Sequence, residues 1–189
     1  MRDVVLDAMS FRCLRELDLL EPCIRAIAGR TNVRLTEYVA RHELNLVDGS
    51  VRSLESAELL RVDRVLRSSP AGKRYREFQR IGWDRGESEG FAMILDEPAS
   101  TRPVFVTTDK NATANARDLG IPVADLFGLL LVAVSDAGLD VGLVENALAY
   151  WDDPHASRCR PKTWQGFAID LGIRLESERV RFGVTTADR

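Results

Sequence analysis

The chain has 189 residues, with 26 Lys and Arg against 29 Asp and Glu, a net charge of −3 and 45% hydrophobic residues. This composition is typical of one folded domain, and it excludes intrinsic disorder, a fibre and binding of nucleic acid through bulk positive charge alone. No stretch reaches the ~18 apolar residues that a membrane helix needs. The acids near the N-terminus argue against a secretory signal.

The cysteines predict a protein of a reducing compartment. Cys13, Cys23 and Cys159 are odd in number and form no CxxC motif. Because the chain has only two histidines, a zinc site built from Cys and His is not expected. We therefore expect reduced, buried cysteines, a cytoplasmic location and no membrane partner.

The first half of the chain alternates predicted strands with predicted helices. In chain order these are a strand at 3–6, a helix at 10–20, a strand at 33–35, a helix at 36–46 capped by Thr36, helical turns at 54–60 with a short strand nearby, a loop at 68–72 and a helix at 73–81. The strands are short aliphatic runs, whereas the helices have apolar residues three or four positions apart.

The alternation continues in the second half. It predicts a helix at 87–96 stopped by Pro98, a strand at 103–107, a helix at 111–119, a strand at 121–123 and a mostly apolar helix at 126–137. Beyond these come a helix at 141–150, a polar break at 151–154, a helix at 163–171 and a charged tail. This order favours an α/β domain over residues 1–140, with a parallel sheet covered on both faces. Residues 141–189 form a helical C-terminal extension, packed on the domain or appended to it.

Four acids are candidates for one site at an edge of that sheet. Asp7 ends the strand VVLD and Asp109 follows the strand in VFVTTD, whereas Glu43 and Glu87 lie on helices that can face the same crevice. Carboxylates gathered in this way repel one another, and a hard divalent cation relieves the repulsion. The alternative is chance, because with 29 acids some must fall at strand ends.

Five segments follow one another in a recognisable order. They read VVLDAMSF, EYVARHEL, DRGESEGFAMIL, VFVTTDKNATANARDLGIPV and FGLLLVAVSDAGL. In this order the chain resembles the PIN domain, closest to the bacterial and archaeal branch with a G-E-x-E helix and a T-x-D-x-x-A motif. The resemblance covers residues 1–140 and is most specific over 84–139. It implies a three-layer α/β/α sandwich and a metal-dependent ribonuclease, in many members the toxin of a toxin–antitoxin pair.

The resemblance also assigns roles to individual acids. Asp7, Glu87 and Asp109 match the family's first acid, the acid of the G-E helix and the acid after the fourth main strand. Glu43 matches the second acid, with Glu37 as the alternative because the proline that usually precedes this helix is absent. Together Asp7, Glu43, Glu87 and Asp109 would hold Mg²⁺ or Mn²⁺, which activates water for endonucleolytic cleavage of RNA.

The sequence departs from the family pattern beside the first acid. Met9 stands where the family often has a small hydroxyl residue, and Ser10 is the substitute. Glu89 is two residues from Glu87, so on a helix it points about 200° away. Asp125 follows a short strand and is expected to cap the next helix.

A basic segment is the candidate contact for the RNA backbone. Residues 61–80 contain seven basic residues and two acids. Lys73, Arg74 and Arg76 are the expected phosphate contacts, with Lys110 beside Asp109 as another. The alternative for the segment is an ordinary solvated helix face.

Two other functions compete with the nuclease. One is an inert PIN-like module that only binds RNA or protein. The other is a phosphatase or phosphate acceptor that uses Asp7, but a dehalogenase-type site needs a second Asp where Met9 stands. For the nuclease, the expected partners are RNA, an antitoxin protein and a second copy of the chain in a homodimer.

Overall fold

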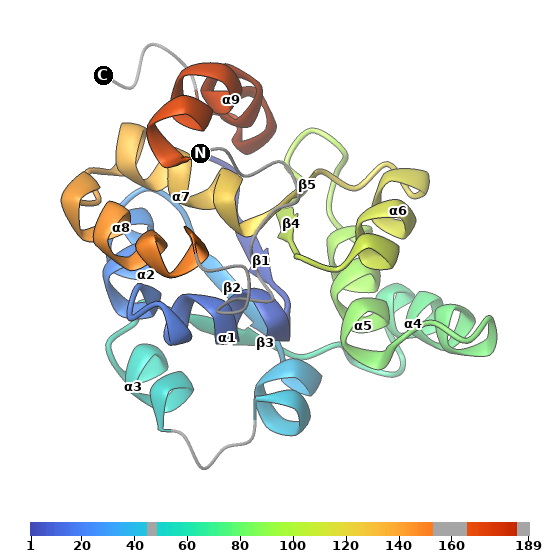
Figure 1. Cartoon of the computed structure of the whole chain (residues 1–189). Helices are drawn as coiled ribbons and strands as arrows, with labels where there is room; N and C mark the ends of the chain where they lie inside the picture. Colours follow the sequence, from blue (N-terminus) through green and yellow to red (C-terminus); the bar gives the residue numbers. More distant parts are fainter. Residues whose placement is uncertain (45–48, 153–165, 185–189) are drawn as a thin grey trace.

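A parallel sheet forms the centre of the computed structural model, which describes residues 1–44, 49–152 and 166–184 (Figure 1). Within these residues five strands lie in the order β3-β2-β1-β4-β5, and every neighbouring pair is parallel. The strands are β1 (Val4–Leu6), β2 (Val33–Thr36), β3 (Arg61–Asp63), β4 (Val104–Val106) and β5 (Val123–Ala124). The predicted α/β class with a parallel sheet is confirmed.

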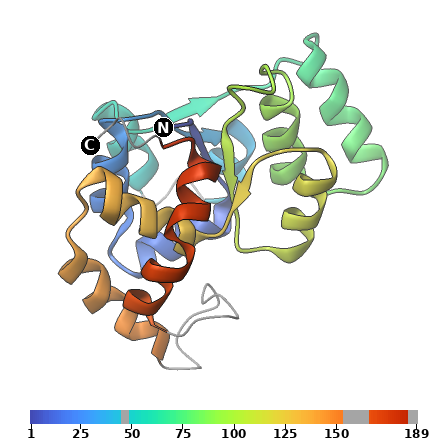
Figure 2. The ribbon, with the colours of Figure 1, turned by 90° about the horizontal axis from the view of Figure 1, so that it is seen from above.

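Helices cover both faces of this sheet. They are α1 (Ala8–Glu16), α2 (Leu20–Ala28), the π-helix η1 (Val39–Glu43), α3 (Ser50–Ser56), α4 (Pro70–Arg80), α5 (Arg85–Ile94), α6 (Lys110–Asp118), α7 (Leu126–Ala137), α8 (Val141–Leu148), the 3₁₀-helix η3 (Ala149–Asp152) and α9 (Phe167–Phe182). Figures 1 and 2 show α4, α5 and α6 on one side of the sheet and α1, α2, α7, α8 and α9 on the other. The arrangement has three layers, helices–sheet–helices.

Each central strand contributes side chains to two hydrophobic cores. In β1, Val4 and Leu6 pack on the side of α1, α2 and α7, whereas Val5 packs beneath α5. In β4, Phe105 likewise joins the core beneath α5, where its ring meets that of Phe91 edge-on. Because both faces are buried, these strands are continuous apolar runs, as parallel strands usually are.

The strand order places β1 at a turning point of the chain. β2 and β3 continue from β1 in one direction, whereas β4 and β5 lie in the other. In open α/β sheets a ligand crevice forms at such a reversal, outside the carboxyl ends of the strands. Here that place lies beyond the ends of β1 and β4.

The C-terminal helices pack on α7 and share its core. Gly128 of α7 is needed here, because a Cβ at this position would lie 2.6 Å from a carboxylate oxygen of Glu178 on α9. Glu178 is 1% exposed and accepts hydrogen bonds from Arg174 at 2.9 Å and Arg181 at 2.8 Å. The segment expected to be a charged tail is therefore helical as far as Phe182, and its charges pair on this helix.

Two predicted elements of the first half have different bounds. The helix expected at 10–20 is α1 followed by α2, because Asp18 adopts a left-handed backbone with φ of 54° between them. The loop expected at 68–72 is wrong in its second half. There Ser69 caps α4 through a 3.0 Å bond from the Gly72 N–H, and Pro70 occupies the first helical position.

The cysteine prediction is confirmed at Cys23 and wrong at Cys13. Cys23 is a free thiol at the centre of the core, and burial raises its pKa to about 12. Cys13 is disulfide-bonded. Cys159 lies outside the described residues. Among the helices that the structure describes, none combines the length and apolarity of a membrane span.

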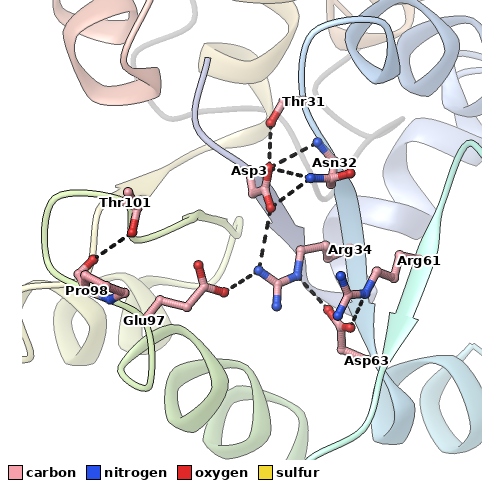
Figure 3. A network of polar contacts seen from close by, with 9 residues as sticks. All are labelled: Asp3, Thr31, Asn32, Arg34, Arg61, Asp63, Glu97, Pro98 and Thr101. Carbon is pink, nitrogen blue, oxygen red and sulfur yellow. Dashed lines mark hydrogen bonds and ion pairs between the residues drawn. The ribbon is translucent and has the colours of Figure 1, made fainter.

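A buried arginine links three parts of the chain on the α5 side of the sheet (Figure 3). Arg34 of β2 is 7% exposed, and its guanidinium bonds Asp63 at 2.6 Å and also Glu97, which follows α5. Asp3 lies 3.7 Å away and holds the turn before β2 through Asn32. Since the charge of Arg34 is compensated by three carboxylates, β2 can carry it inside an otherwise apolar sheet.

Candidate active site

Asp7 and Asp109 are brought together by one buried hydroxyl group. Thr107, which is 1% exposed, donates a hydrogen bond to Asp7 Oδ2 and accepts one from the Asp109 N–H at 3.0 Å. The other oxygen of Asp7 accepts from the Ser10 N–H at 2.6 Å. Because β1 and β4 are neighbours in register, Asp7 and the turn that contains Thr107 and Asp109 leave the sheet side by side.

Glu87 faces these two residues from the first turn of α5. Its carboxylate lies near Asp109, Asp84 and Asp7 and accepts a hydrogen bond from Asn115 of α6. Burial, followed by those three charges in the order given, raises the pKa of Glu87 to about 7. Near neutral pH this carboxyl group therefore exchanges between its charged and neutral forms, as groups at functional sites often do.

Glu43 reaches the same crevice from the end of η1. The N–H of Leu44 bonds the carbonyl of Val39 at 3.0 Å, a π-helical bond of a kind that is frequent at functional sites. Burial raises the pKa of Glu43, and the charges of Asp84 and Asp7 raise it further. Glu37, the alternative second acid, instead pairs with Arg41 at 2.8 Å and Arg64 at 3.3 Å.

Gly86 makes the position of Glu43 sterically feasible. The backbone of Gly86 lies against the Glu43 carboxylate and lowers its pKa, and a side chain at residue 86 would collide with Oε1 of that group. The glycine before Glu87 thus leaves room for the Glu43 carboxylate.

The sequence interpretation missed two charged residues of this crevice, the acid Asp84 and the basic residue Arg12. Asp84 caps α5 through a 2.8 Å bond from the Gly86 N–H, and its charge raises the pKa of both Glu43 and Glu87. An Asp three residues before a Glu is a helix-start signal that would have found it. Arg12 of α1 donates to the Glu43 carbonyl, and its charge lowers the pKa of the same residue.

The pKa of Asp7 is raised, mainly by burial of its carboxyl group. Hydrogen bonds from Thr107 and Ser10 lower this pKa in part. The charge of Asp109 raises this pKa further. Glu43, Glu87 and Asp7 are thus all harder to ionise than usual, and each owes part of that to another acid of the crevice. Repulsion within such a group of acids costs free energy in the folded state, and a bound cation would remove this cost.

The acids of the described residues do not form a metal cage. Among the residues the structure describes, no group of three or more His, Cys, Asp or Glu side chains is arranged to hold a metal ion. Asp7, Asp84 and Asp109 each give one oxygen to the backbone as a helix N-cap. N-capping is a structural role that Asp fills in many proteins.

Other predicted residues lie away from the crevice or on its rim. Glu89 is buried and accepts from the Tyr38 N–H at 2.7 Å, so it faces away from Glu87 as expected. Asp125 caps α7 with a 2.7 Å bond from the N–H of the third helical residue, as predicted. Lys110 is exposed at the first position of α6.

Two arginines of the basic segment 61–80 already contact other parts of the protein. Arg74 pairs with Asp96 at 3.0 Å, and Arg76 donates to the Arg67 carbonyl at 2.6 Å. Lys73 is exposed on α4. For Arg74 and Arg76, these contacts favour the alternative, in which they belong to an ordinary solvated helix face rather than to a phosphate-binding site.

Comparison with known proteins identifies no relative: no protein family, curated protein or solved structure that was compared matches the chain.

Proposed function

We propose that the chain is a PIN-type ribonuclease that uses Mg²⁺ or Mn²⁺ and cuts RNA internally. The observation that supports this most is that Asp109, Glu87 and Glu43, on three other segments of the chain, each lie near Asp7 at the carboxyl edge of the sheet. The three-layer fold and the order of the motifs agree with the PIN resemblance. In a toxin, the expected partner is an antitoxin protein.

The donor set fits a hard cation. Carboxylate oxygens are the ligands that Mg²⁺ and Mn²⁺ prefer, and the acids whose charges act on Glu87 are the carboxylates of Asp109, Asp84 and Asp7. Asp7, Glu43, Glu87 and Asp109 would hold the ion, with Asp84 as a further ligand. When bound, the cation supplies an activated water and stabilises negative charge on the phosphate.

The protein groups have distinct tasks in this proposal. Thr107 and the Ser10 N–H fix the orientation of Asp7. The Arg12 guanidinium beside Glu43 offers a positive charge on the rim, where it can contact a phosphate oxygen. Glu87 exchanges its proton near neutral pH, so it can receive a proton, and it would lose its proton to solvent when a metal binds.

The test combines metal binding with RNA cleavage. Mn²⁺ at a hundredfold excess over its Kd should raise the melting temperature by about 5–10 °C. The substitutions Asp7→Asn and Asp109→Asn should abolish both this shift and the metal-dependent cleavage of a mixed single-stranded RNA. Glu89→Gln is the matched control for the Mn²⁺ shift, since it lies on the same helix as Glu87 but faces Tyr38.

Two outcomes would overturn the proposal. If wild-type protein shows no Mn²⁺ shift, the carboxylates are helix caps and the inert module is the better account. If Asp109→Asn cleaves RNA at the wild-type rate, the activity belongs to another site or to a contaminant.

A further inference from the structure

A second pocket lies beside the carboxylates and has a different chemistry. It encloses about 400 Å³ and is lined by residues from four segments: η1 with the turn before it, the loop after β3, α4 and α5. Its walls carry aromatic and basic side chains together with Glu37 and Glu89. The side chains that matter most are Tyr38, His42, Tyr75, Arg41, Arg64 and Arg67.

The aromatic side of the pocket is held in place. The ring centroids of Tyr38 and His42 are 4.8 Å apart, and the guanidinium carbon of Arg85 lies 5.9 Å from the centre of the Tyr38 ring. The Tyr38 backbone is fixed by the 2.7 Å bond to Glu89, which is 8% exposed. Tyr75 lies close to Tyr38, and burial raises the pKa of the Tyr75 phenol.

The basic side of the pocket is pre-positioned by one acid. Glu37 pairs with Arg41 at 2.8 Å and with Arg64 at 3.3 Å, while the two arginine side chains remain 60% and 71% exposed. Arg67 faces Tyr75 from the loop after β3. An arginine that bonds one carboxylate keeps further N–H donors, so this rim can bind the oxygens of a phosphate group.

The pocket and the carboxylate crevice share their supporting elements. Tyr38 stands just before η1 and Glu43 is the last residue of η1, whereas Glu89 and Glu87 lie on one helix. Arg85, which covers Tyr38, is the first residue of α5 and neighbours Asp84. The two sites therefore share η1 and α5, with Glu87 and Glu89 pointing to different faces of α5.

We propose that this pocket holds one unpaired nucleotide of the RNA substrate, with its base against Tyr38 and its phosphate on Arg41 and Arg64. The inference rests on the proposed nuclease function and adds a separate nucleotide-binding site to it. An unpaired base stacks readily on tyrosine or histidine, whereas a paired base must first be flipped out of its duplex, which costs free energy.

The first test measures nucleotide binding without metal, so it does not depend on catalysis. Wild-type protein in EDTA is titrated with AMP, UMP, adenosine and inorganic phosphate, and binding is followed by NMR or calorimetry. Both nucleotides should bind more tightly than adenosine or phosphate. Tyr38→Ala should weaken AMP binding by about fivefold to a hundredfold, while Tyr38→Phe keeps most of it.

Arg41→Gln tests the phosphate side against a matched control. Arg41 and Glu37 form an i,i+4 pair with a 60% exposed arginine, and Arg25 and Glu21 form the same kind of pair on α2, also with a 60% exposed arginine. Arg41→Gln should weaken AMP binding but not adenosine binding, whereas Arg25→Gln should change neither.

The second test uses RNA and separates this inference from the proposed function. In the metal-loaded protein, Tyr38→Ala should raise the KM for a single-stranded RNA more than it lowers kcat, and Tyr38→Phe should restore the KM. If the wild type cleaves RNA but binds no nucleotide and Tyr38→Ala keeps its KM, the pocket proposal is wrong and the nuclease stands. Binding of AMP by a protein without nuclease activity supports the pocket and overturns the nuclease.

Discussion

The carboxylate of Glu43 lies directly against the backbone of Gly86, so the second acid and the G-E motif form one structural unit. Any side chain at residue 86 would collide with Glu43 Oε1. The obstructing atom is the tip of a flexible side chain, which can move without disturbing the core. The position of the carboxylate can therefore be changed while the fold is kept.

Gly86→Ala should displace Glu43 at little cost in stability. Alanine favours a helix over glycine by about 1 kcal/mol, which offsets the contact with Val39. We expect the free energy of unfolding without metal to change by less than about 1 kcal/mol. The Mn²⁺-induced shift in melting temperature should fall by half or more, because one ligand has moved.

Gly29→Ala is the control for this experiment, since a Cβ at residue 29 meets no atom within 4 Å. It should leave the Mn²⁺ shift unchanged. Should Gly86→Ala retain the full shift, Glu43 is not a metal ligand.

The strands and the main acids were predictable because their causes are local. A strand buried on both faces is a run such as VVL or VFV, and an acid after each run must reach the common edge of a parallel sheet. For the same reason α7 has the predicted bounds, since its apolar run ends at Gly138 with φ of 77°.

Other features depend on contacts between distant segments, and the sequence pattern does not contain them. The pattern alone does not distinguish Glu43 from Glu37 as the second acid; in the structure only Glu43 faces the crevice, from the end of a π-helical segment. The break at Asp18 is hidden because the apolar period continues on both sides of it. Arg34 is buried only because Asp63 and Glu97 meet it in the folded chain.

Thr107→Val should weaken the site while keeping the shape of the side chain. The substitution removes the hydrogen bond to Asp7 and the acceptor of the Asp109 N–H. Leaving buried polar groups without partners costs about 1–3 kcal/mol in the free energy of unfolding. Mn²⁺ affinity should fall as well, because Asp7 loses the contact that orients it.

Thr107→Ser keeps the hydroxyl and should retain Mn²⁺ binding, although it loses the buried methyl group. Urea unfolding and calorimetric titration with Mn²⁺ measure the two effects separately. Equal Mn²⁺ affinity in Thr107→Val and the wild type would show that this hydroxyl has only a structural role.

The buried ion-pair network of Arg34 should be needed for folding rather than for the site (Figure 3). Arg34→Met removes the 2.6 Å partner of Asp63, which is 8% exposed and keeps its 2.5 Å contact with the exposed Arg61. Removing one partner of a buried pair costs about 3–5 kcal/mol. Replacing both residues, as in Arg34→Met with Asp63→Leu, should recover most of that loss in urea unfolding. A single variant as stable as the wild type would show that the pair is solvated.

Glu87 should make the stability of the metal-free protein depend on pH. Its pKa is raised from 4.5 to about 7, so between these values the folded state binds more protons than the unfolded state. The free energy of unfolding therefore falls as the pH rises from about 4.5 to about 7, and the loss is complete above that range. Glu87→Gln removes the titrating group, so it should be more stable than the wild type at pH 8 and nearly equal to it at pH 4.5.

Mn²⁺ should reverse this difference. Because a metal ion requires the charged carboxylate, its binding releases the proton of Glu87, and affinity should rise with pH through about 7. Unfolding in urea at several pH values, with EDTA or with Mn²⁺, measures both effects on the same two proteins. If the wild type and Glu87→Gln keep a constant difference in stability from pH 4.5 to 8, Glu87 does not titrate in the crevice. Its carboxylate would then be solvated and too far from Asp7, Asp84 and Asp109 to share a cation with them.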